Sequence, residues 1–575
     1  MKYELIKNDY KNLSLVETIL TNRGFELEDI EHYLNTTSSD VIPPEHLTNI
    51  KEGVTLLIKH IAANDKIFLQ IDGDCDGITS SAFFLNYLWK LFPSFTQNNI
   101  IYSFHFGKEH GLILEEIPEN VQMVIAIDSA SFDYEIHHAL KEKNIDVLVI
   151  DHHDAPYYSL DACVINNQLD GKYNNKTLSG VGMAYKFCSY IDKLMNTHYA
   201  EEGLDLVALG MIADMISLQN FETKYLIDKG LSNPLNPFFV KLFEKNSFSM
   251  KDKLTPTSVA FYMAPYVNGM VRSGTQDQKM LLFDSMLEYK AKTEIASTKR
   301  GHKGEMEELV EQSVRTCTNV KKKQDEGRDE GLEKLKKIVD ERNLCENKVI
   351  VILLDENNKI EANLGGLVAN QLMSHYKQPV CVLRDTGEMW EGSCRAPRIL
   401  DFKDLYEASE LLDYAAGHQH AFGIGIKKDK VQDFIDYTNK VLADVDFSTN
   451  YQVDFIYQSN ALSGQDILQV ADLDTVWGQT IEEPMIAIEN IKLNKNNVNI
   501  MGKNKNTLKI MLPNNISLIK FNCSQEELEQ FQINDMGVST INIVGTCAAN
   551  EWLGESTPQI MIKDYEFQKK YEYYF

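Results

Sequence analysis

The chain has 575 residues, of which 43% are apolar and 25% charged, close to the average of globular domains, so general disorder is excluded. At about 100–200 residues per domain, this length predicts three to five domains. The net charge of −27 argues against a protein coated in positive charge for nucleic-acid binding, although a local basic channel remains compatible with it.

No stretch approaches 18 consecutive apolar residues, so we expect no transmembrane helix and no membrane partner. Residues 1–5 (MKYEL) do not begin an apolar signal segment, and we expect a cytoplasmic protein. The nine cysteines are scattered and form no CxxC pair. Free thiols are therefore expected, and neither a zinc site nor a disulfide framework is.

The first part of the chain changes its pattern near residue 65. Residues 1–64 have helical spacing of apolar positions and are predicted to be a helical lead-in. Residues 65–285 are predicted to be an α/β domain, because short β-branched runs alternate with helix-capable stretches and the region after 204 is mostly helical. The predicted strands of its parallel sheet are residues 66–71, 100–104, 121–127 and 146–150.

Three further regions follow this domain. Residues 286–345 are rich in Glu and Lys and are predicted to be one or two solvated helices that link domains. Residues 346–445 begin with the apolar run 349–354 and carry a second α/β pattern. Residues 450–575 contain five short alternating segments, which indicates a small β-barrel.

The strongest local signal is the segment 72–77 (DGDCDG), which directly follows a predicted strand. Its carboxylates Asp72, Asp74 and Asp76 alternate along the chain, and a divalent cation such as Mg²⁺ or Mn²⁺ would offset their repulsion. An EF-hand loop would need a glutamate at its twelfth position. Phe83 or Leu85 occupies that position here, so the EF-hand interpretation fails.

Other carboxylates and histidines also follow predicted strands. Asp128 comes after the strand 121–127, and Asp151, His152 and His153 come at the end of the next one. Asp214 ends an apolar stretch. Each alone is more readily explained by a turn, a helix cap or a structural histidine. Because the carboxyl ends of parallel strands share one edge of a sheet, the residues after the strands are expected to converge there, and so many ligands suggest two metal ions about 4 Å apart.

These motifs resemble, in order and approximate spacing, the four motifs of the DHH phosphoesterase superfamily, and most closely the RecJ single-strand-DNA-specific exonucleases. Four further segments resemble RecJ motifs: LSGVGMAYK at 178–186, LDLVALGMIAD at 204–214, APYVN at 264–268 with Arg272, and GHQHAFG at 417–423, which is typical of the DHHA1 domain. The resemblance covers nearly the whole chain. It implies a DHH domain, a helical linker, a DHHA1 domain and a C-terminal OB-fold.

The resemblance also implies two catalytic metals, Mn²⁺ or Mg²⁺, and a set of carboxylate and imidazole ligands. Transferred motif by motif, the ligands are Asp74, Asp76, Asp128, His152 and Asp214, with Asp72 either a ligand or hydrogen-bonded to one. Asp128 is the expected bridging ligand. Asp151 is expected to orient His152, as carboxylates do for metal-bound imidazoles, and His153 to face the scissile phosphate.

RecJ-like enzymes degrade single-stranded DNA from the 5′ end and release mononucleotides. Ser393 and Arg395 resemble the turn that contacts the terminal phosphate, a role that suits a hydroxyl and a planar guanidinium. Lys108 stands near the usual position of an arginine. Arg272, Gly417 and His418 are further candidates for contacts with the substrate, and His418 is also a candidate catalytic residue.

The sequence departs from the family pattern at three places. Gln70 replaces a histidine that many relatives have, which predicts a difference at one metal. Tyr266 replaces an arginine and removes one DNA contact. Residues 477–484 (WGQTIEEP) are a degraded family motif near the start of the OB-fold. Tyr457, Trp477 and Trp552 are candidates either for base stacking in that domain or for its core.

We therefore expect a metal-dependent 5′→3′ exonuclease for single-stranded DNA, acting in repair or recombination, with a single-strand-binding protein or a helicase as candidate partner. A DHH oligoribonuclease or (cyclic) dinucleotide phosphodiesterase is the first alternative, but such enzymes are typically shorter and lack an OB domain. A non-catalytic DNA-binding scaffold is the second alternative, but such relatives lose metal ligands that are retained here. Preference for DNA over RNA, the physiological metal and a cellular or phage origin stay open.

Overall fold

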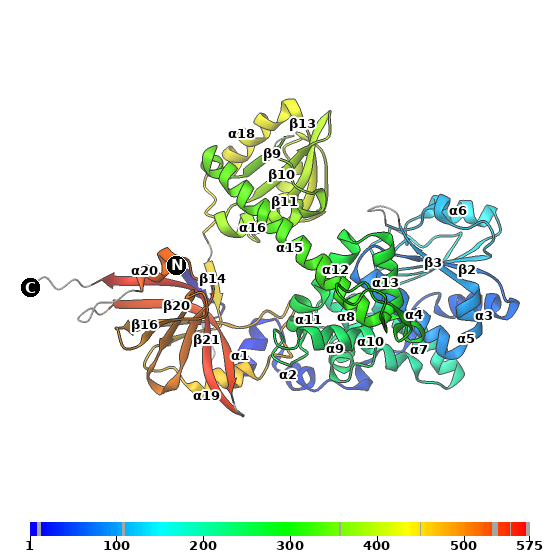
Figure 1. The fold of residues 1–575 in the computed structure, drawn as a ribbon, viewed down its shortest axis with the longest axis horizontal. Coiled ribbons are helices and arrows are strands. Elements are labelled where there is room, and N and C mark those ends of the chain that lie inside the picture. The colour runs from blue at the N-terminus through cyan, green and yellow to red at the C-terminus, as the bar shows by residue number, and fades with distance from the viewer. Residues whose placement is uncertain are drawn as a thin grey trace, which may run out of the picture. The chain divides into compact units, whose positions relative to one another are not determined.

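The computed structural model describes residues 1–7, 13–105, 110–355, 358–448, 450–531, 539–552 and 554–570 (Figure 1). The chain forms two compact units. The first comprises residue 1 with residues 3–317 and 451–575, and the second comprises residue 2 with residues 318–450. Within the described ranges, no helix combines the length and apolarity needed to cross a membrane.

The first unit is built around a five-stranded parallel sheet with the strand order β3-β2-β4-β5-β6. Its strands are β2 (Ile67–Ile71), β3 (Ile100–Phe104), β4 (Met123–Ile127), β5 (Asp146–Asp151) and β6 (Cys163–Asn166). Every residue of β2 and β4 is buried, as expected for a parallel sheet that is covered on both faces. The four predicted strands are confirmed, and β6 is an addition.

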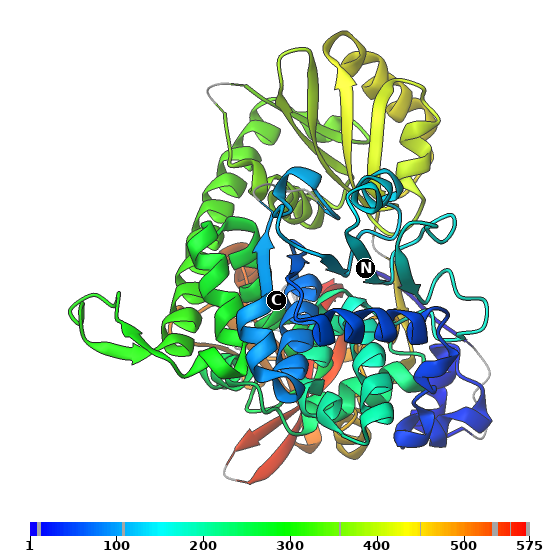
Figure 2. The ribbon, with the colours of Figure 1, turned by 90° about the vertical axis from the view of Figure 1, so that its right-hand side faces the viewer.

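Helices cover both faces of this sheet (Figure 2). Helices α3 (Ile50–Ala63), α4 (Cys75–Leu91) and α7 (Gly180–Met195) pack on one face, where Gly53 of α3 allows a close approach to Ile165 of β6. Helix α6 (Tyr134–Glu142) packs on the other face. Helices α4 and α6 follow β2 and β4. Because the sheet is parallel, all strand ends that carry polar motifs lie at the same edge.

Along the chain, the remaining helices of this part precede the strands of the sheet, lie between two of them or follow the last one. The N-terminal α1 begins with a capping box in which Ser14 and Glu17 satisfy each other's backbone N–H groups. The predicted helical character of residues 204–285 is confirmed. These helices are α1 (Leu15–Asn22), α2 (Leu27–Leu34), α5 (Pro93–Asn99), α8 (Leu204–Ala213), α9 (Phe221–Ser232), α10 (Pro237–Asn246), α11 (Pro256–Tyr262), α12 (Ala264–Ser273) and α13 (Gln276–Met286).

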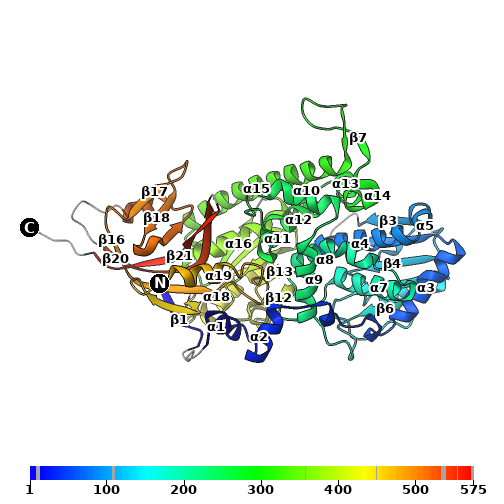
Figure 3. The same cartoon turned by 90° about the horizontal axis from the view of Figure 1, so that it is seen from below.

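Residues 286–345 differ in part from their prediction. After α14 (Glu288–Ala291), strands β7 (Glu294–Ala296) and β8 (Met306–Glu308) form an antiparallel hairpin that the sequence did not suggest. The hairpin is followed by the 33-residue helix α15 (Leu309–Glu341) (Figure 3). A helix was expected here, but α15 is not solvated all round, because Val314, Leu335 and Val339 on it are buried. Strands of three residues are too short to show the alternation of apolar and polar residues that is typical of a strand. The prediction for this region therefore rested on its many charged residues, which indicated a solvated helix.

The second unit holds a mixed five-stranded sheet with the strand order β12-β13-β11-β10-β9, in which only β9 and β10 are parallel. Helix α16 (Gly365–Tyr376) packs on one face, and α17 (Phe402–Glu407) and α18 (Val431–Val441) pack on the other. The strands are β9 (Ile350–Leu354), β10 (Val380–Asp385), β11 (Met389–Arg395), β12 (Leu412–His418) and β13 (Ala421–Lys427).

The C-terminal part of the first unit is a seven-stranded sheet with the order β15-β16-β20-β21-β19-β18-β17, accompanied by α19 (Gly464–Ala471) and α20 (Gln525–Gln530). The predicted segment 490–501 is divided between two strands, because residues 494–497 make a turn. The strands are β15 (Phe455–Gln458), β16 (Met485–Leu493), β17 (Val498–Met501), β18 (Thr507–Met511), β19 (Ser517–Lys520), β20 (Ser539–Trp552) and β21 (Glu555–Lys570), and a separate pair joins β1 (Lys2–Leu5) to β14 (Asn450–Val453).

All nine cysteines are free. The candidates for base stacking differ in exposure. Trp477 is only 5% exposed and belongs to the core, whereas Tyr457 on β15 is half-buried. The side chain of Trp552 lies outside the described part of the structure. Trp477 is therefore excluded from stacking, Tyr457 remains a candidate, and the prediction for Trp552 stays a prediction.

Candidate metal centre

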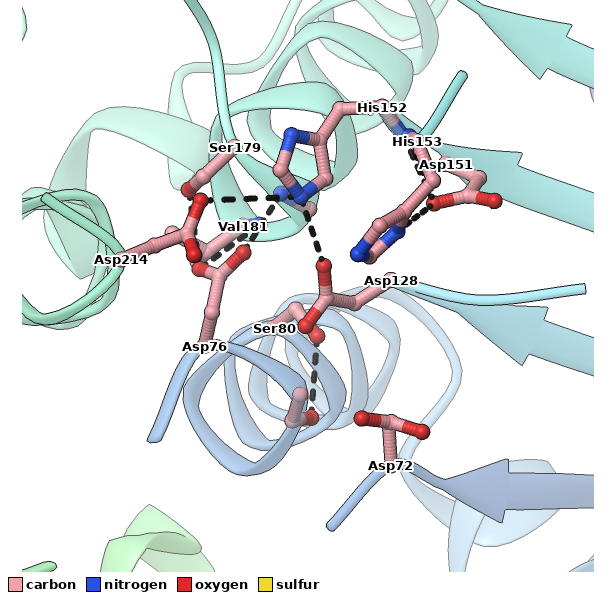
Figure 4. Close-up of polar contacts among 12 residues, drawn as sticks. Asp72, Asp76, Ser80, Asp128, Asp151, His152, His153, Ser179, Val181 and Asp214 are labelled. Atoms are coloured by element: carbon pink, nitrogen blue, oxygen red, sulfur yellow. Dashed lines mark hydrogen bonds and ion pairs between the residues drawn. The ribbon is translucent and has the colours of Figure 1, made fainter. Parts of the chain in front are cut away.

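Carboxylates and imidazoles from separate segments meet at the carboxyl edge of the parallel sheet (Figure 4). Asp72 follows β2, Asp128 follows β4, and His152 follows β5, while Asp214 lies directly after α8. Their ligand atoms form three overlapping groups, in each of which the atoms lie within 4.8 Å of one another. The groups are Asp72 with Asp74 and Asp128, Asp76 with His152 and Asp214, and Asp128 with His152 and His153.

Helix α4 begins inside the DGDCDG segment, and this start fixes two of its carboxylates. Asp74 is the N-cap, and its Oδ1 accepts a hydrogen bond from the N–H of Gly77 at 3.0 Å. Asp76, in the first turn, is 1% exposed and accepts hydrogen bonds from Ser179 Oγ at 2.9 Å and from the N–H of Gly180 at 2.6 Å. Motif residues on α4 and α7 are thus held together through Asp76.

Asp128 has an unusual backbone conformation for a residue with a side chain. Its φ is +69°, in the left-handed region, and its N–H donates to the carbonyl of Ile150 at 2.9 Å. The side chain is 2% exposed, and its Oδ1 has no hydrogen-bond partner among the described residues. A strained backbone and an unpaired buried oxygen at one residue are features that cluster at functional sites.

The ring of His152 points between two carboxylates (Figure 4). Its Nε2 lies 3.1 Å from Asp128 Oδ1 and 3.6 Å from Asp214 Oδ2. The angles at Nε2 do not satisfy a hydrogen bond with any described residue, although the distances are short. The nitrogen of His152 and the oxygen of Asp128 thus approach each other without a hydrogen bond between them, which is typical of a position where a cation binds.

Asp151 holds the ring of His153, which corrects the expectation that it orients His152. Its Oδ1 accepts hydrogen bonds from His153 Nδ1 at 2.8 Å and from the backbone N–H of His152 at 2.7 Å, and its Oδ2 accepts from the N–H of Ser131 at 3.1 Å. The ring of His152 has turned away toward Asp128. Asp151 is fully buried and saturated with donors, while the side chain of His153 is half exposed.

The electrostatics of the cluster favour positive charge. Burial and repulsion from Asp76 raise the pKa of Asp74, and burial together with the neighbouring carboxylates raises the pKa of Asp128 well above its ordinary value. Burial, then Asp76 and Asp74, raise the pKa of Asp214 to about 8. Burial lowers the pKa of His152 to about 4, so this imidazole is neutral and available as a ligand.

The donor set fits a hard divalent cation. It combines several carboxylate oxygens with one neutral imidazole, which is a set that Mn²⁺ and Mg²⁺ accept. The unpaired Oδ1 of Asp128 and Nε2 of His152 face the same space. A cation there would satisfy both atoms and relieve the repulsion that raises the carboxyl pKa values.

Glycines let the backbone approach the carboxylates. A Cβ on Gly180, at the start of α7, would lie 2.4 Å from the Cβ of Asp128, and one on Gly210, in α8, would lie 2.5 Å from Asp76 Oδ1. A Cβ on Gly77 would lie 2.6 Å from the Cβ of Asp72. These close approaches were not predicted, although all three glycines stand in the motif segments.

Two further residues lie near the centre without being predicted ligands. His110 was not predicted at all, and its Nδ1 lies 3.1 Å from Asp72 Oδ2; histidines outside the motif left no signal in the sequence. Gln70 is fully buried on β2, and its Nε2 donates to the carbonyl of Ser103 on β3 at 3.1 Å. Gln70 thus contacts the neighbouring strand and belongs to none of the three ligand groups.

The predicted contacts for DNA fall into three cases. Arg272 is exposed in the last turn of α12. Burial and Asp74 raise the pKa of Cys75 in the DGDCDG segment, and the positive charge of Arg272 acts in the opposite direction. Lys108 lies outside the described residues. The others belong to the second unit: Ser393 and Arg395 on β11, and Gly417 and His418 at the end of β12.

Comparisons with known proteins agree with this geometry. The family models that match are the DHH family, N-terminal domain, over residues 66–211 and the RecJ OB domain over residues 453–564. YorK of Bacillus subtilis strain 168, named as an SPbeta prophage-derived single-strand DNA-specific exonuclease, is 36% identical over 98% of both chains. The chain belongs to the RecJ-like exonucleases of the DHH family. This confirms the resemblance found in the sequence.

One further relative supports the assignment, and one solved structure supports the fold. The single-stranded-DNA-specific exonuclease RecJ of the same Bacillus subtilis strain is 26% identical over 96% of this chain and 67% of its own. The crystal structure of RecJ from Thermus thermophilus in complex with Mn²⁺ covers 98% of this chain and 78% of its own, with a TM-score of 0.70 at 16% identity. The predicted α/β architecture with a C-terminal OB domain is confirmed.

The carboxylate pKa values predict how pH and metal act on stability. A carboxyl group whose pKa is raised on folding stabilises the fold while protonated, and this contribution is lost as the pH rises through the folded value, which is about 8 for Asp214. Between pH 7 and 8.5, where His152 is largely neutral in the folded and the unfolded chain, the melting temperature in EDTA should therefore fall. The raised pKa of His153, about 9, adds to this fall. Differential scanning calorimetry with and without excess Mg²⁺ measures this, because the cation replaces the protons and should flatten the slope.

The Asp214→Asn variant is the control for this prediction. This substitution keeps the size of the side chain but removes the carboxyl group whose pKa is about 8. In EDTA, the melting temperature of the variant should therefore fall less with rising pH than that of the wild type. Equal melting temperatures at both pH values, with and without Mg²⁺, would contradict a carboxylate cluster built for a cation.

Proposed function

We propose that this protein is a metal-dependent exonuclease that degrades single-stranded DNA in the 5′→3′ direction to 5′-mononucleotides. The observation that carries the proposal is the convergence of Asp128, His152 and Asp214 with the DGDCDG carboxylates at one sheet edge. This centre lies in a chain that is related over 98% of its length to YorK. A role in repair or recombination follows from the family.

The proposal includes two divalent cations, Mn²⁺ or Mg²⁺. Asp74, Asp76, Asp128, His152 and Asp214 would hold them, with Asp72 beside them. Asp128 and His152 each belong to two of the three ligand groups, which supports a shared, bridging position for Asp128. Cations bound there supply the Lewis acidity that activates water and offsets the charge that develops on the phosphate.

The side chains around the cations have separate tasks in this proposal. Asp151 fixes His153 through Nδ1, which leaves Nε2 free to face a substrate on the exposed side. The hydrogen bond to Asp151 raises the pKa of His153 to about 9, so the imidazole carries a proton at neutral pH. It can therefore donate a hydrogen bond to a phosphate oxygen or a proton to the departing oxygen.

The 5′→3′ polarity is supported by a candidate phosphate site in the second unit. Ser393 and Arg395 on β11 lie against the first turn of α16, where a Cβ on Gly366 would be 2.7 Å from Arg395 Nη2 and 3.5 Å from Ser393 Oγ. A guanidinium, a hydroxyl and the start of a 12-residue helix form a set that suits a terminal phosphate. We assign the 5′ phosphate to these groups, and the neighbouring DNA backbone to Gly417, His418, Arg272 and Lys108.

The assignment of the 5′ phosphate predicts a loss of end discrimination. Arg395→Ala should reduce the preference for 5′-phosphorylated over 5′-hydroxyl DNA by about tenfold or more, because a hydrogen-bonded charge pair contributes about 1.5–3 kcal/mol. Arg398→Ala, which changes an exposed arginine three residues later, is the control and should keep the preference. Initial rates on the two oligonucleotides measure it. An unchanged ratio in Arg395→Ala would exclude Arg395 from this site.

The alternative functions are less well supported. A phosphodiesterase for dinucleotides has no use for an OB domain, and residues 453–564 match the RecJ OB domain. A scaffold has no need of the ligands, yet all of the transferred ligands occur in the three groups. A single-strand-binding protein or a helicase remains our proposal for a protein partner.

The test of polarity uses single-stranded oligonucleotides blocked by phosphorothioate linkages at one end or the other, incubated with Mn²⁺. We expect a block at the 5′ end to stop the release of mononucleotides and a block at the 3′ end to leave it unchanged. A duplex with blunt ends should be resistant. Degradation that only a 3′ block stops, or cleavage of dinucleotides alone, would contradict the proposed function.

A further inference from the structure

The hairpin formed by β7 and β8 projects from the helices around it. Its strands pair with the register Glu294 to Glu308, Ile295 to Glu307 and Ala296 to Met306. Figure 3 shows the connecting loop extending beyond α13 and α14. The loop belongs to none of the three ligand groups and carries no residue of the predicted site. Its role is therefore not explained by the metal centre.

Charge is segregated along this hairpin. The tip, residues 297–305 (STKRGHKGE), contains three cations, Lys299, Arg300 and Lys303, and one acid, although the whole chain has a net charge of −27. That acid, Glu305, lies 3.0 Å from His302 Nδ1. The three cations are exposed, and none forms an ion pair with another described residue. The other acids lie at the base, where Glu294 faces Glu308. A basic tip on an acidic protein is a local site for a polyanion.

The base and tip are held by specific contacts. Arg315 on α15 donates to both carboxylate oxygens of Glu307, at 2.5 and 2.6 Å. The N–H of Thr298 donates to Gln312 Oε1 at 2.9 Å, and the N–H of Lys299 donates to Ser297 Oγ at 3.1 Å. A loop that is already ordered loses less conformational entropy when it binds a ligand.

We propose that the tip of this hairpin binds the phosphate backbone of single-stranded DNA as a second contact outside the metal centre. The proposal rests on the proposed function, since that function supplies a polyanion as the substrate. Lys299, Arg300 and Lys303 lie within five residues, no Phe, Tyr or Trp accompanies them, and the ring of His302 is paired with Glu305. The tip therefore contacts phosphates in any sequence and does not stack bases. A local contact of this kind also counters the repulsion between DNA and the acidic surface.

The test compares the full-length protein with the variant Lys299→Gln/Arg300→Gln/Lys303→Gln. Fluorescence anisotropy with a 40-nucleotide single strand in EDTA measures binding without hydrolysis. We expect the affinity at low salt to fall by about tenfold or more, and the slope of log affinity against log salt to become flatter by about 2, as for three lost phosphate contacts on single strands. With Mn²⁺, the hydrolysis rate of a trinucleotide should stay unchanged.

The matched control removes the same charge elsewhere. Lys51→Gln/Lys143→Gln/Lys229→Gln neutralises three exposed lysines on α3, near the end of α6 and on α9, and should bind the long strand almost as the wild type does. Two results would overturn the proposal. The hairpin variant would bind DNA as tightly as the wild type if the tip served an acidic protein instead, and both variants would lose affinity equally if only the net charge mattered. A wild type that binds DNA in EDTA but never hydrolyses it would refute the proposed function and leave this site standing.

Discussion

Replacing Asp128 by asparagine is expected to lower the hydrolysis of single-stranded DNA by at least about 10³-fold, which corresponds to about 4 kcal/mol of transition-state stabilisation. Asp128 belongs to two of the three ligand groups, and its Oδ1 lies 3.1 Å from His152 Nε2. An amide keeps the shape of the side chain but removes the charge that two cations would share. Single-turnover rates with saturating Mn²⁺ measure the effect.

Asp154→Asn is the matched control for this substitution. Asp154 is an exposed carboxylate two residues after His152, and it belongs to none of the ligand groups. Its amide variant should retain activity within about threefold. Burial and Asp76 raise the pKa of the Asp128 carboxyl group, which means that its ionisation is unfavourable in the folded protein. An asparagine cannot ionise, so the metal-free variant should be at least as stable as the wild type. Activity of Asp128→Asn close to that of the wild type would remove the metal centre from the mechanism.

Two substitutions of glycine by alanine in one helix are expected to differ in their effect by about 10²-fold. Gly180 and Gly182 both lie in the first turn of α7. A methyl group on Gly180 would meet the Cβ of Asp128 at 2.4 Å and Asp128 Oδ1 at 2.5 Å, so Asp128 must move. A displacement of about 1 Å at a catalytic group can reduce the rate about 10²-fold. We therefore expect Gly180→Ala to lose activity and to bind Mn²⁺ more weakly.

Gly182→Ala tests whether this loss is specific. A methyl group there would lie 3.2 Å from the Cβ of Leu178, so it requires only a small shift of an apolar neighbour. Its activity should stay within about threefold of the wild type, and the helix gains propensity from alanine. Circular dichroism and the melting temperature show whether Gly180→Ala remains folded. Equal activities of the two variants would mean that the close approach to Asp128 has no role in catalysis.

The sheet and the convergence of its polar ends were predictable because parallel strands impose one geometry. Once the strands before Asp72, Asp128 and Asp151 are recognised, their carboxyl ends must share an edge. Asp214 follows a helix, so its position beside Asp76 depended on the family resemblance and on how α8 packs. The α/β class of the domain was predictable because apolar, β-branched runs alternate with helix-capable stretches along the sequence.

Details that depend on packing were not predictable. The sequence does not show that Asp151 holds His153 while His152 turns to Asp128, because adjacent histidines can exchange these roles by rotating one side chain. The hairpin before α15 has strands of only three residues, too short for a period to be seen. His110 reaches Asp72 across a loop, and contacts of this kind leave no pattern along the chain.

The central claim is that the sheet-edge cluster holds two divalent cations that carry out the hydrolysis, and the number of cations bound tests it most directly. Isothermal titration of the metal-free protein with Mn²⁺ at pH 7.5 should give two equivalents per chain, with release of protons from carboxyl groups such as Asp214, whose pKa is about 8. Asp128→Asn should lose at least one equivalent. Binding of no Mn²⁺ by the wild type, or the same stoichiometry and affinity in Asp128→Asn, would contradict the account.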